Sequence, residues 1–323
     1  MFGPPPAFGT VESLYRAAPN GRVDGLRHDA GTAETEDEKP MRLATKTAPT
    51  LLFGALFFAS AALGQTVTAP ASLPAIGYAD LADLAFAGQV AVIVTVGNSV
   101  HLKDADAAGV APGFARFYIE GGVNALIAGR GGLPASVSWI ADVPMTAANR
   151  LPKLKKAKLI LLARPVPGKP GMLQLVSKTA QLVWTPETEQ RLRAILSDAN
   201  GPAAPPVVTG IGHAFHVAGS IPGEGETQIF LKTADNRPVS LNVQRHPGED
   251  SRWTVSLGEI VDDAAAAPQR DTLLWYRLAC ALPPALPDDA VADQAPDDAK
   301  AAQADYKLVL DGLGPCGRTA PAN

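Results

Sequence analysis

The 323-residue sequence has few of the residues that usually build metal and redox sites, with only two cysteines and five histidines. Neither cysteine lies in a Cys-x-x-Cys pair or beside a histidine, which disfavours a zinc centre or a catalytic thiol. Neither sign of charge dominates, because 28 basic residues stand against 32 acidic ones. A protein that binds nucleic acid through its overall electrostatic field needs an excess of basic residues. We therefore expect no nucleic-acid partner. We also expect no cofactor and no bound metal.

Long apolar runs are scarce too, and the most pronounced one lies near residue 50. Arg42 and Lys46 precede a stretch of apolar and small residues over 51–63, and small residues continue up to Gln65. These features are the three parts of a secretory signal peptide. The run is shorter than the roughly 20 residues that span a bilayer. We therefore predict a signal peptide over 41–64, cleaved before Gln65, and a periplasmic or secreted protein with no transmembrane span after cleavage.

Residues 1–40 do not resemble part of a signal peptide, because they are rich in proline, glycine and charge. An acidic cluster over 34–38 would spoil the positive start of a signal peptide. Glu and Lys codons are all purine, so residues 36–39 would encode a purine-rich tract ahead of Met41, as a bacterial ribosome-binding site does. We predict that residues 1–40 are disordered and untranslated, with translation starting at Met41. The alternative is a real cytoplasmic tail on an uncleaved signal anchor.

The two cysteines, Cys280 and Cys316, form an even pair. In an oxidising compartment such a pair favours one disulfide bond. The residues between them are acidic and rich in Pro and Ala, which predicts a disordered linker over 285–305. The disulfide would then hold a C-terminal segment, 306–323, against the rest of the protein. The alternative is two unrelated cysteines, with Cys280 buried on a helix.

The first half of the mature chain is rich in predicted strands. Apolar and β-branched runs alternate with turns rich in Gly and Pro. A helix follows, with Thr185 as N-cap, Pro186 at the first helical position and Asn200-Gly201 at its end. Five strands in this order resemble a five-stranded OB-fold barrel with a terminal helix, over 75–200. The predicted strands cover 88–102, 114–129, 136–143, 158–166 and 172–178.

A Pro-rich stretch over 201–208 predicts a linker between two domains. Beyond it lie four strand-like segments, two of which flank a turn over 234–237 as a β-hairpin, and a helix follows near residue 275. We therefore expect a small α+β domain over 209–284, with an antiparallel sheet and a C-terminal helix. The predicted fold class is α+β, dominated by β structure.

Several stretches resemble an uncharacterised family of exported proteins from sphingomonad-type alphaproteobacteria. The resemblance covers most of the mature chain and implies an address in the cell envelope. It implies no activity, so no residue role comes from it. The stretches are GYADLADL, ARFYIEGG, PKLKKAKLILLARPV, GEGETQIFLKTADNRPVSL and RDTLLWYRLAC.

A basic stretch is the most notable candidate site. Lys153, Lys155, Lys156 and Lys158 occur in a region without acidic residues. In the envelope such a patch could bind an anionic lipid, lipopolysaccharide or an acidic polymer. The alternatives are a solvated loop, lysines that protect a strand edge, or pairing with the acidic segment 288–298.

The histidines are weaker candidates for a metal-binding or catalytic site. His213 and His216 are three apart in a strand-like context, where an odd offset places two side chains on opposite faces. Ser99 and His101 share a face, but no acidic residue accompanies them to complete a catalytic set. The sequence therefore assigns no activity. We expect a binding or scaffolding role in the envelope, with a hydrolase assembled from distant residues as the alternative.

Overall fold

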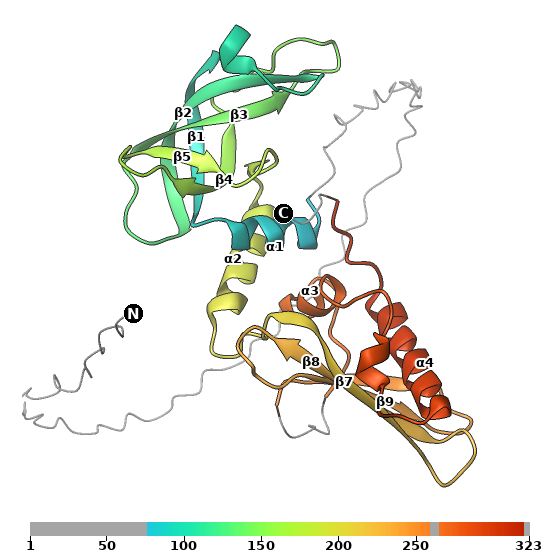
Figure 1. Ribbon diagram of the computed structural model, residues 1–323. Helices are drawn as coiled ribbons and strands as arrows, with labels where there is room; N and C mark the ends of the chain where they lie inside the picture. Colours follow the sequence, from blue (N-terminus) through green and yellow to red (C-terminus); the bar gives the residue numbers. More distant parts are fainter. Residues whose placement is uncertain (1–75, 259–264, 320–323) are drawn as a thin grey trace, which may run out of the picture. The chain divides into compact units, whose positions relative to one another are not determined.

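The computed structural model describes residues 76–258 and 265–319 (Figure 1). The predicted signal peptide over 41–64 and the predictions for residues 1–40 lie outside the described residues. So do the last four residues of the predicted C-terminal segment. None of the helices within the described ranges is long and apolar enough to cross a membrane.

Five strands close into a barrel, as the sequence predicted. Each strand follows its neighbour in the order β1-β2-β3-β5-β4, and β4 pairs back onto β1. All of these pairs are antiparallel except β3 with β5. The strands are β1 Val90–His101, β2 Phe114–Gly129, β3 Ser136–Pro144, β4 Lys158–Pro165 and β5 Met172–Leu175.

Alternation of side chains along β3 shows which face of this strand lines the barrel core. Along β3 every second residue from Val137 to Val143 is buried, and the residues between them face outward. The inward side chains fill the barrel with a core in which Ile119 and Trp139 are almost fully buried. Gly121 lies against Trp139, since a side chain at this glycine would meet the indole ring at 3.2 Å.

Three short elements accompany the barrel. The 3-10 helix η1, Asp104–Ala107, lies in the connection between β1 and β2. The strand β6, Gln181–Val183, pairs with the first half of β4, while β5 pairs with the second half. The helix α1, Tyr78–Ala87, precedes β1 and buries most of its residues. The sequence did not predict β6, which is only three residues long.

The helix α2, Pro186–Asn200, begins and ends where its capping residues predict. The hydroxyl of Thr185 accepts a hydrogen bond from the Thr188 backbone N–H at 3.1 Å, and Pro186 occupies the first helical position. Leu192 and Ile195 are fully buried on one side of the helix.

The second half of the chain contains a four-stranded antiparallel sheet in the order β10-β9-β8-β7. The helix α3, Leu273–Ala279, follows the sheet, and α4, Pro296–Leu313, packs on β7 and β8. The predicted antiparallel sheet and C-terminal helix are therefore confirmed. The strands are β7 Val208–Ala218, β8 Gly225–Thr233, β9 Ser240–Arg245 and β10 Arg252–Ser256.

The prediction of a disordered linker over 285–305 is corrected by the structure. The 3-10 helix η2, Asp288–Val291, and the first half of α4 occupy this range. Pro296 stands at the start of α4, and two aspartates lie in its first turn, where the helix dipole favours negative charge. The buried residues of α4 are Ala302, Asp305, Tyr306, Val309 and Leu313, which form one helical stripe.

The C-terminal segment is fixed by two kinds of contact. The sulfur atoms of Cys280 and Cys316 lie 2.03 Å apart, the distance of the predicted disulfide bond. Beyond it, Arg318 donates to both carboxylate oxygens of Asp83 on α1, at 2.5 and 2.9 Å. The Thr319 hydroxyl and backbone N–H donate to Asp80 at 2.5 and 2.9 Å. The chain after residue 314 is therefore tied to α1 and α3.

Candidate functional site

An apolar row crosses the outer face of three barrel strands. In the strand register, Val100 of β1 lies opposite Tyr118 of β2, and Tyr118 lies opposite Ile140 of β3. Val100 and Ile140 expose 49% and 52% of their surface. Scattered exposed apolar residues are ordinary, but three in one cross-strand row form a continuous surface.

Polar pairs border this apolar row on both sides. In the neighbouring row toward the β1–β2 connection, Arg116 donates to both oxygens of Asp142, at 2.7 and 3.0 Å. The hydrogen bonds from Arg116 lower the pKa of the Asp142 carboxyl below its usual value. Arg116 also donates to the carbonyl of Ala108 at 3.1 Å, which fixes the connection between β1 and β2. In the row on the other side, Asn98 donates to Glu120 at 3.4 Å.

A hollow of about 470 Å³ opens beside the row. Tyr118 and Ile140 form part of its wall, so the row and the hollow make one surface, which we call the barrel face. Its size is within the range of small-molecule sites in proteins. Its polar lining comprises Arg116, Asp142, Gln174, Ser177 and Lys178.

The four lysines of the predicted anion site do not share one environment. Lys153, Lys155 and Lys156 are exposed in the connection between β3 and β4. Lys158 lies on β4, where its Nζ is 3.3 Å from the centroid of the Trp184 ring, a cation–π contact. The described residues contain no ion pair between these lysines and the acidic segment 288–298. An anion site here would therefore rest on the first three lysines.

The two histidines of β7 point to opposite faces of the sheet. His216 lies opposite the buried Thr227 on the α4 side, and its Nδ1 is 2.8 Å from the Thr227 hydroxyl. His213 lies on the other face, opposite Phe230, with its ring 6.4 Å from the ring of Phe215. Within the described ranges, no group of three metal-binding side chains comes together.

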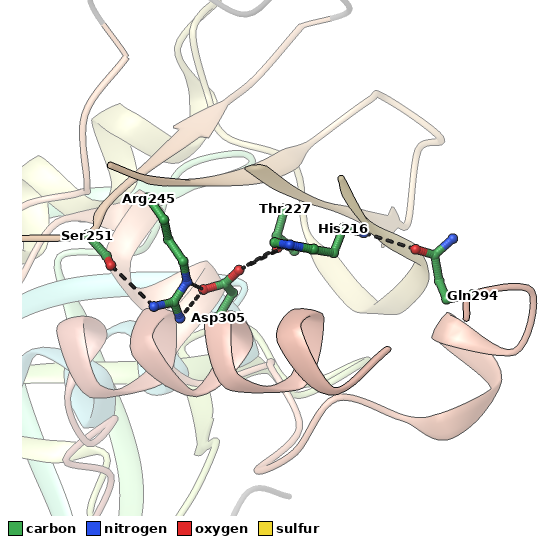
Figure 2. Close-up of polar contacts among 6 residues, drawn as sticks. All are labelled: His216, Thr227, Arg245, Ser251, Gln294 and Asp305. Carbon is green, nitrogen blue, oxygen red and sulfur yellow. Dashed lines mark hydrogen bonds and ion pairs between the residues drawn. The ribbon is translucent and has the colours of Figure 1, made fainter. Parts of the chain in front are cut away.

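The network around His216 brings a hydroxyl, an imidazole and a carboxylate together (Figure 2). The Thr227 hydroxyl donates to Asp305 of α4 at 2.5 Å, so His216 Nδ1 must donate to Thr227. Arg245 donates to the other oxygen of Asp305 at 2.5 Å, and Gln294 accepts from the His216 backbone N–H.

This arrangement does not make a catalytic triad. In a triad the imidazole stands between the hydroxyl and the carboxylate and removes the proton of the nucleophile. Here the hydroxyl of Thr227 stands between His216 and Asp305, and both Thr227 and Asp305 are fully buried. The network therefore fixes α4 to the sheet, and it gives the hydrolase alternative no support.

No residue of the barrel face was identified as a candidate from the sequence. The alternation along β2 and β3 predicts which side chains point outward, Tyr118 and Ile140 among them. It does not predict that these two lie opposite each other, because register depends on the pairing of distant strands.

No family model and no curated protein matches this chain. No residue role is therefore transferred from a relative, and the resemblance to exported proteins stays a prediction.

Proposed function

We propose that the protein is an exported binding protein of the cell envelope and that its barrel face binds an oligosaccharide. The observation that carries this proposal is the exposed row of Val100, Tyr118 and Ile140 beside the hollow. In OB-fold barrels the outer surface around the second and third strands binds oligonucleotides and oligosaccharides.

Charge favours the oligosaccharide over the oligonucleotide. The whole sequence carries a formal net charge of −4, which opposes binding of a polyanion. On the barrel face the charge of Arg116 is neutralised by Asp142, and the positive charge of Lys178 in the hollow is balanced by Glu120 beside the row, so this surface has no basic excess. A sugar chain presents flat C–H surfaces to the apolar row and hydroxyl groups to the polar pairs that border it.

An array of bacterial envelope oligosaccharides tests the proposal. We expect the protein to bind at least one neutral glycan, and Tyr118→Ala or Ile140→Ser to weaken that binding about tenfold, or about 1.4 kcal/mol. The matched control is Val183→Ser, which changes another exposed apolar residue, 61% exposed, away from the barrel face. Absence of binding across the array, or equal losses in all three variants, would contradict the proposal.

Binding of an anionic envelope component is a second candidate function. It is favoured by the exposure of Lys153, Lys155 and Lys156, none of which pairs with an acidic side chain of the described residues. Three exposed lysines near an anionic membrane surface contribute roughly 1 kcal/mol each. Retention on vesicles of anionic lipid should fall when all three are changed to Gln. Unchanged retention would remove this candidate.

A further inference from the structure

Two turns of the barrel each carry one basic residue among glycines. Arg130 lies in the β2–β3 connection, in the run Gly-Arg-Gly-Gly, and Lys169 lies in the β4–β5 connection, in the run Gly-Lys-Pro-Gly. The two turns touch, since a Cβ atom at Gly171 of the second turn would lie 3.0 Å from the Pro134 ring of the first. Both basic residues therefore lie at the same end of the barrel.

One hollow of about 420 Å³ is lined by both turns. Arg130 and Lys169 are the only charged residues among the described residues that line it. Neither side chain forms a hydrogen bond or an ion pair within the described part of the chain. Arg116 on the barrel face, by contrast, is neutralised by Asp142. The hollow therefore carries two positive charges without a counter-charge, which favours an anionic ligand.

The main chain also borders this hollow, because a glycine consists of main-chain atoms alone. Gly131, Gly132 and Gly168 line it, and their N–H groups donate no hydrogen bond within the described ranges. Gly131 and Gly168 have φ angles of +81° and +71°. Turns with such residues often form concave backbone surfaces that bind anions. Backbone donors are therefore available beside the two charges.

The rest of the lining is apolar or glycine. Val90 and Leu173 are almost fully buried, and Leu126 exposes 37% of its surface. An apolar group bound against such a surface is removed from water, which stabilises the complex. An inorganic ion has no apolar group and gains nothing there. The ligand that fits the hollow best is therefore an anion attached to an apolar group.

The number of charges selects the kind of anion. A carboxylate and a phosphodiester each carry one negative charge near neutrality, whereas a phosphate monoester carries about 1.5 to 2. Of these three, only the monoester balances both Arg130 and Lys169. We propose that this hollow binds a phosphate monoester, whose phosphate pairs with Arg130 and Lys169 and whose organic part packs on Leu126.

This hollow is distinct from the barrel face and from the exposed lysines of the β3–β4 connection. It shares apolar lining residues with the hollow of the barrel face, Val166, Met172 and Leu173, but none of the polar ones. Segment 153–156 follows β3, whereas the two turns follow β2 and β4. The proposal therefore does not depend on oligosaccharide binding or on that segment.

Isothermal titration calorimetry of the full chain tests the proposal. The probes are phenyl phosphate, inorganic phosphate, which lacks the apolar ring, and benzoate, which has the ring but a single negative charge. We expect phenyl phosphate to bind with a dissociation constant of about 1 mM or below, and about tenfold more tightly than either of the others. Absence of binding overturns the proposal. So does inorganic phosphate or benzoate that binds as tightly as phenyl phosphate.

Charge variants place the phosphate at the two turns. Arg130→Gln and Lys169→Gln should each weaken binding of phenyl phosphate about tenfold, because each removes one charged donor. Both positions are exposed, so the thermal midpoint should not change. Lys103→Gln, in the β1–β2 connection, removes an exposed positive charge elsewhere on the barrel and is the matched control. Equal losses in the three variants would mean that only the net charge matters, and the proposed site would be wrong.

A pair of substitutions at Leu126 separates charge from shape. Leu126→Glu and Leu126→Gln introduce side chains of nearly equal size, but only Glu brings a negative charge into the hollow that Arg130 lines. We expect Leu126→Glu to abolish detectable binding of phenyl phosphate and Leu126→Gln to retain most of it. Similar affinities of the two variants would contradict the proposal.

A phosphate monoester reaches the protein either as a soluble metabolite or as a lipid headgroup. Adenosine 5′-monophosphate and vesicles that contain phosphatidic acid represent the two sources. The vesicles are tested with Lys153, Lys155 and Lys156 all changed to Gln, so that these lysines do not contribute. Displacement of phenyl phosphate by the nucleotide identifies a soluble ligand, and retention on the vesicles that is lost in Arg130→Gln identifies a lipid. If neither is observed, the proposal is wrong.

The same calorimetry keeps this hollow distinct from the barrel face. Tyr118→Ala should leave the binding of phenyl phosphate unchanged, even if it abolishes binding on the glycan array. Loss of phenyl phosphate binding in Tyr118→Ala would place the phosphate on the barrel face and overturn its assignment to this hollow.

Discussion

The carboxylate of Asp305 is fully buried, and its partners come from two strands of the sheet. Arg245 of β9 supplies the opposite charge, and Thr227 of β8 donates a hydrogen bond at 2.5 Å. Such a group is stabilising only while its partners remain, since a buried charge without a partner is costly. Asp305 therefore determines how α4 lies on the sheet.

Removal of this carboxylate should destabilise the protein strongly. Asp305→Ala leaves Arg245 and Thr227 without their acceptor, and we expect the free energy of unfolding to fall by about 2–5 kcal/mol. Urea denaturation measures the change. Asp311→Ala on the same helix is the control, because the Asp311–Lys307 pair is exposed and should contribute less than about 1 kcal/mol. Similar losses in the two variants would show that Asp305 has no special role.

The Asp83 carboxyl on α1 makes the stability of the fold depend on pH. Burial alone would raise its pKa, but hydrogen bonds from Arg318 and Tyr276 outweigh that effect and lower the pKa below its ordinary value. A lowered pKa in the folded state stabilises the fold above the unfolded pKa of about 3.9, and this contribution disappears as the pH falls through the folded pKa. The stabilisation is therefore present near neutrality and lost in acid.

Asp83→Asn tests this linkage. We expect the wild type to be more stable than the variant at pH 6, by about 1 kcal/mol or less because the site is partly exposed to solvent. The difference should shrink as the pH is lowered from 5 to 2. Urea midpoints measured at several pH values give the comparison, and a difference that stays constant in acid would refute the linkage.

At the scale of the element, the barrel depends on a close contact between β2 and β3. A Cβ atom at Gly121 would meet the Thr95 carbonyl oxygen at 3.0 Å and the Trp139 ring at 3.2 Å. Gly121→Ala should therefore lower the free energy of unfolding by about 1–3 kcal/mol through overpacking. Gly122→Ala is the matched control, since nothing lies within 4 Å of its added methyl group, and it should change stability by less than about 0.5 kcal/mol. Equal effects in a thermal melt would mean that the contact with Trp139 is unimportant.

Most helices and strands were predictable from the sequence, but the first half of α4 was not. Strict alternation of apolar and polar residues predicts strands such as β3, and capping residues predict the bounds of α2. The first half of α4 contains mainly Ala, Asp, Gln and Lys, so it lacks the large apolar residues that mark a helical face. Ala302 and Asp305 are buried there because the sheet provides close packing and a charged partner, and neither is visible in a local window.

The barrel face was less predictable than the fold. The outward direction of Tyr118 follows from alternation, but its position between Val100 and Ile140 follows from the register of three strands. The barrel face depends on which distant residues meet, and that information is not present in any single segment.

At the scale of the whole molecule, the Cys280–Cys316 bond closes a loop with a sequence separation of 36 residues. Replacing both cysteines by Ala should lower the free energy of unfolding by roughly 3–4 kcal/mol in the chain-entropy model. Urea denaturation with and without a thiol reductant measures this, and the reductant should act on the wild type alone. A double variant as stable as the wild type would show that the contacts of Arg318 and Thr319 hold the C-terminal segment without the bond.

The contact between Arg318 and Asp83 also has a consequence for biosynthesis. The two residues are separated by 235 positions, so α1 leaves the ribosome long before its partner is made. Until synthesis has passed residue 318, Asp83 has the hydroxyl of Tyr276 as a partner but lacks the opposite charge of Arg318. A chain interrupted before that point lacks this ion pair, so its α1 is held only by its buried apolar residues and by Tyr276.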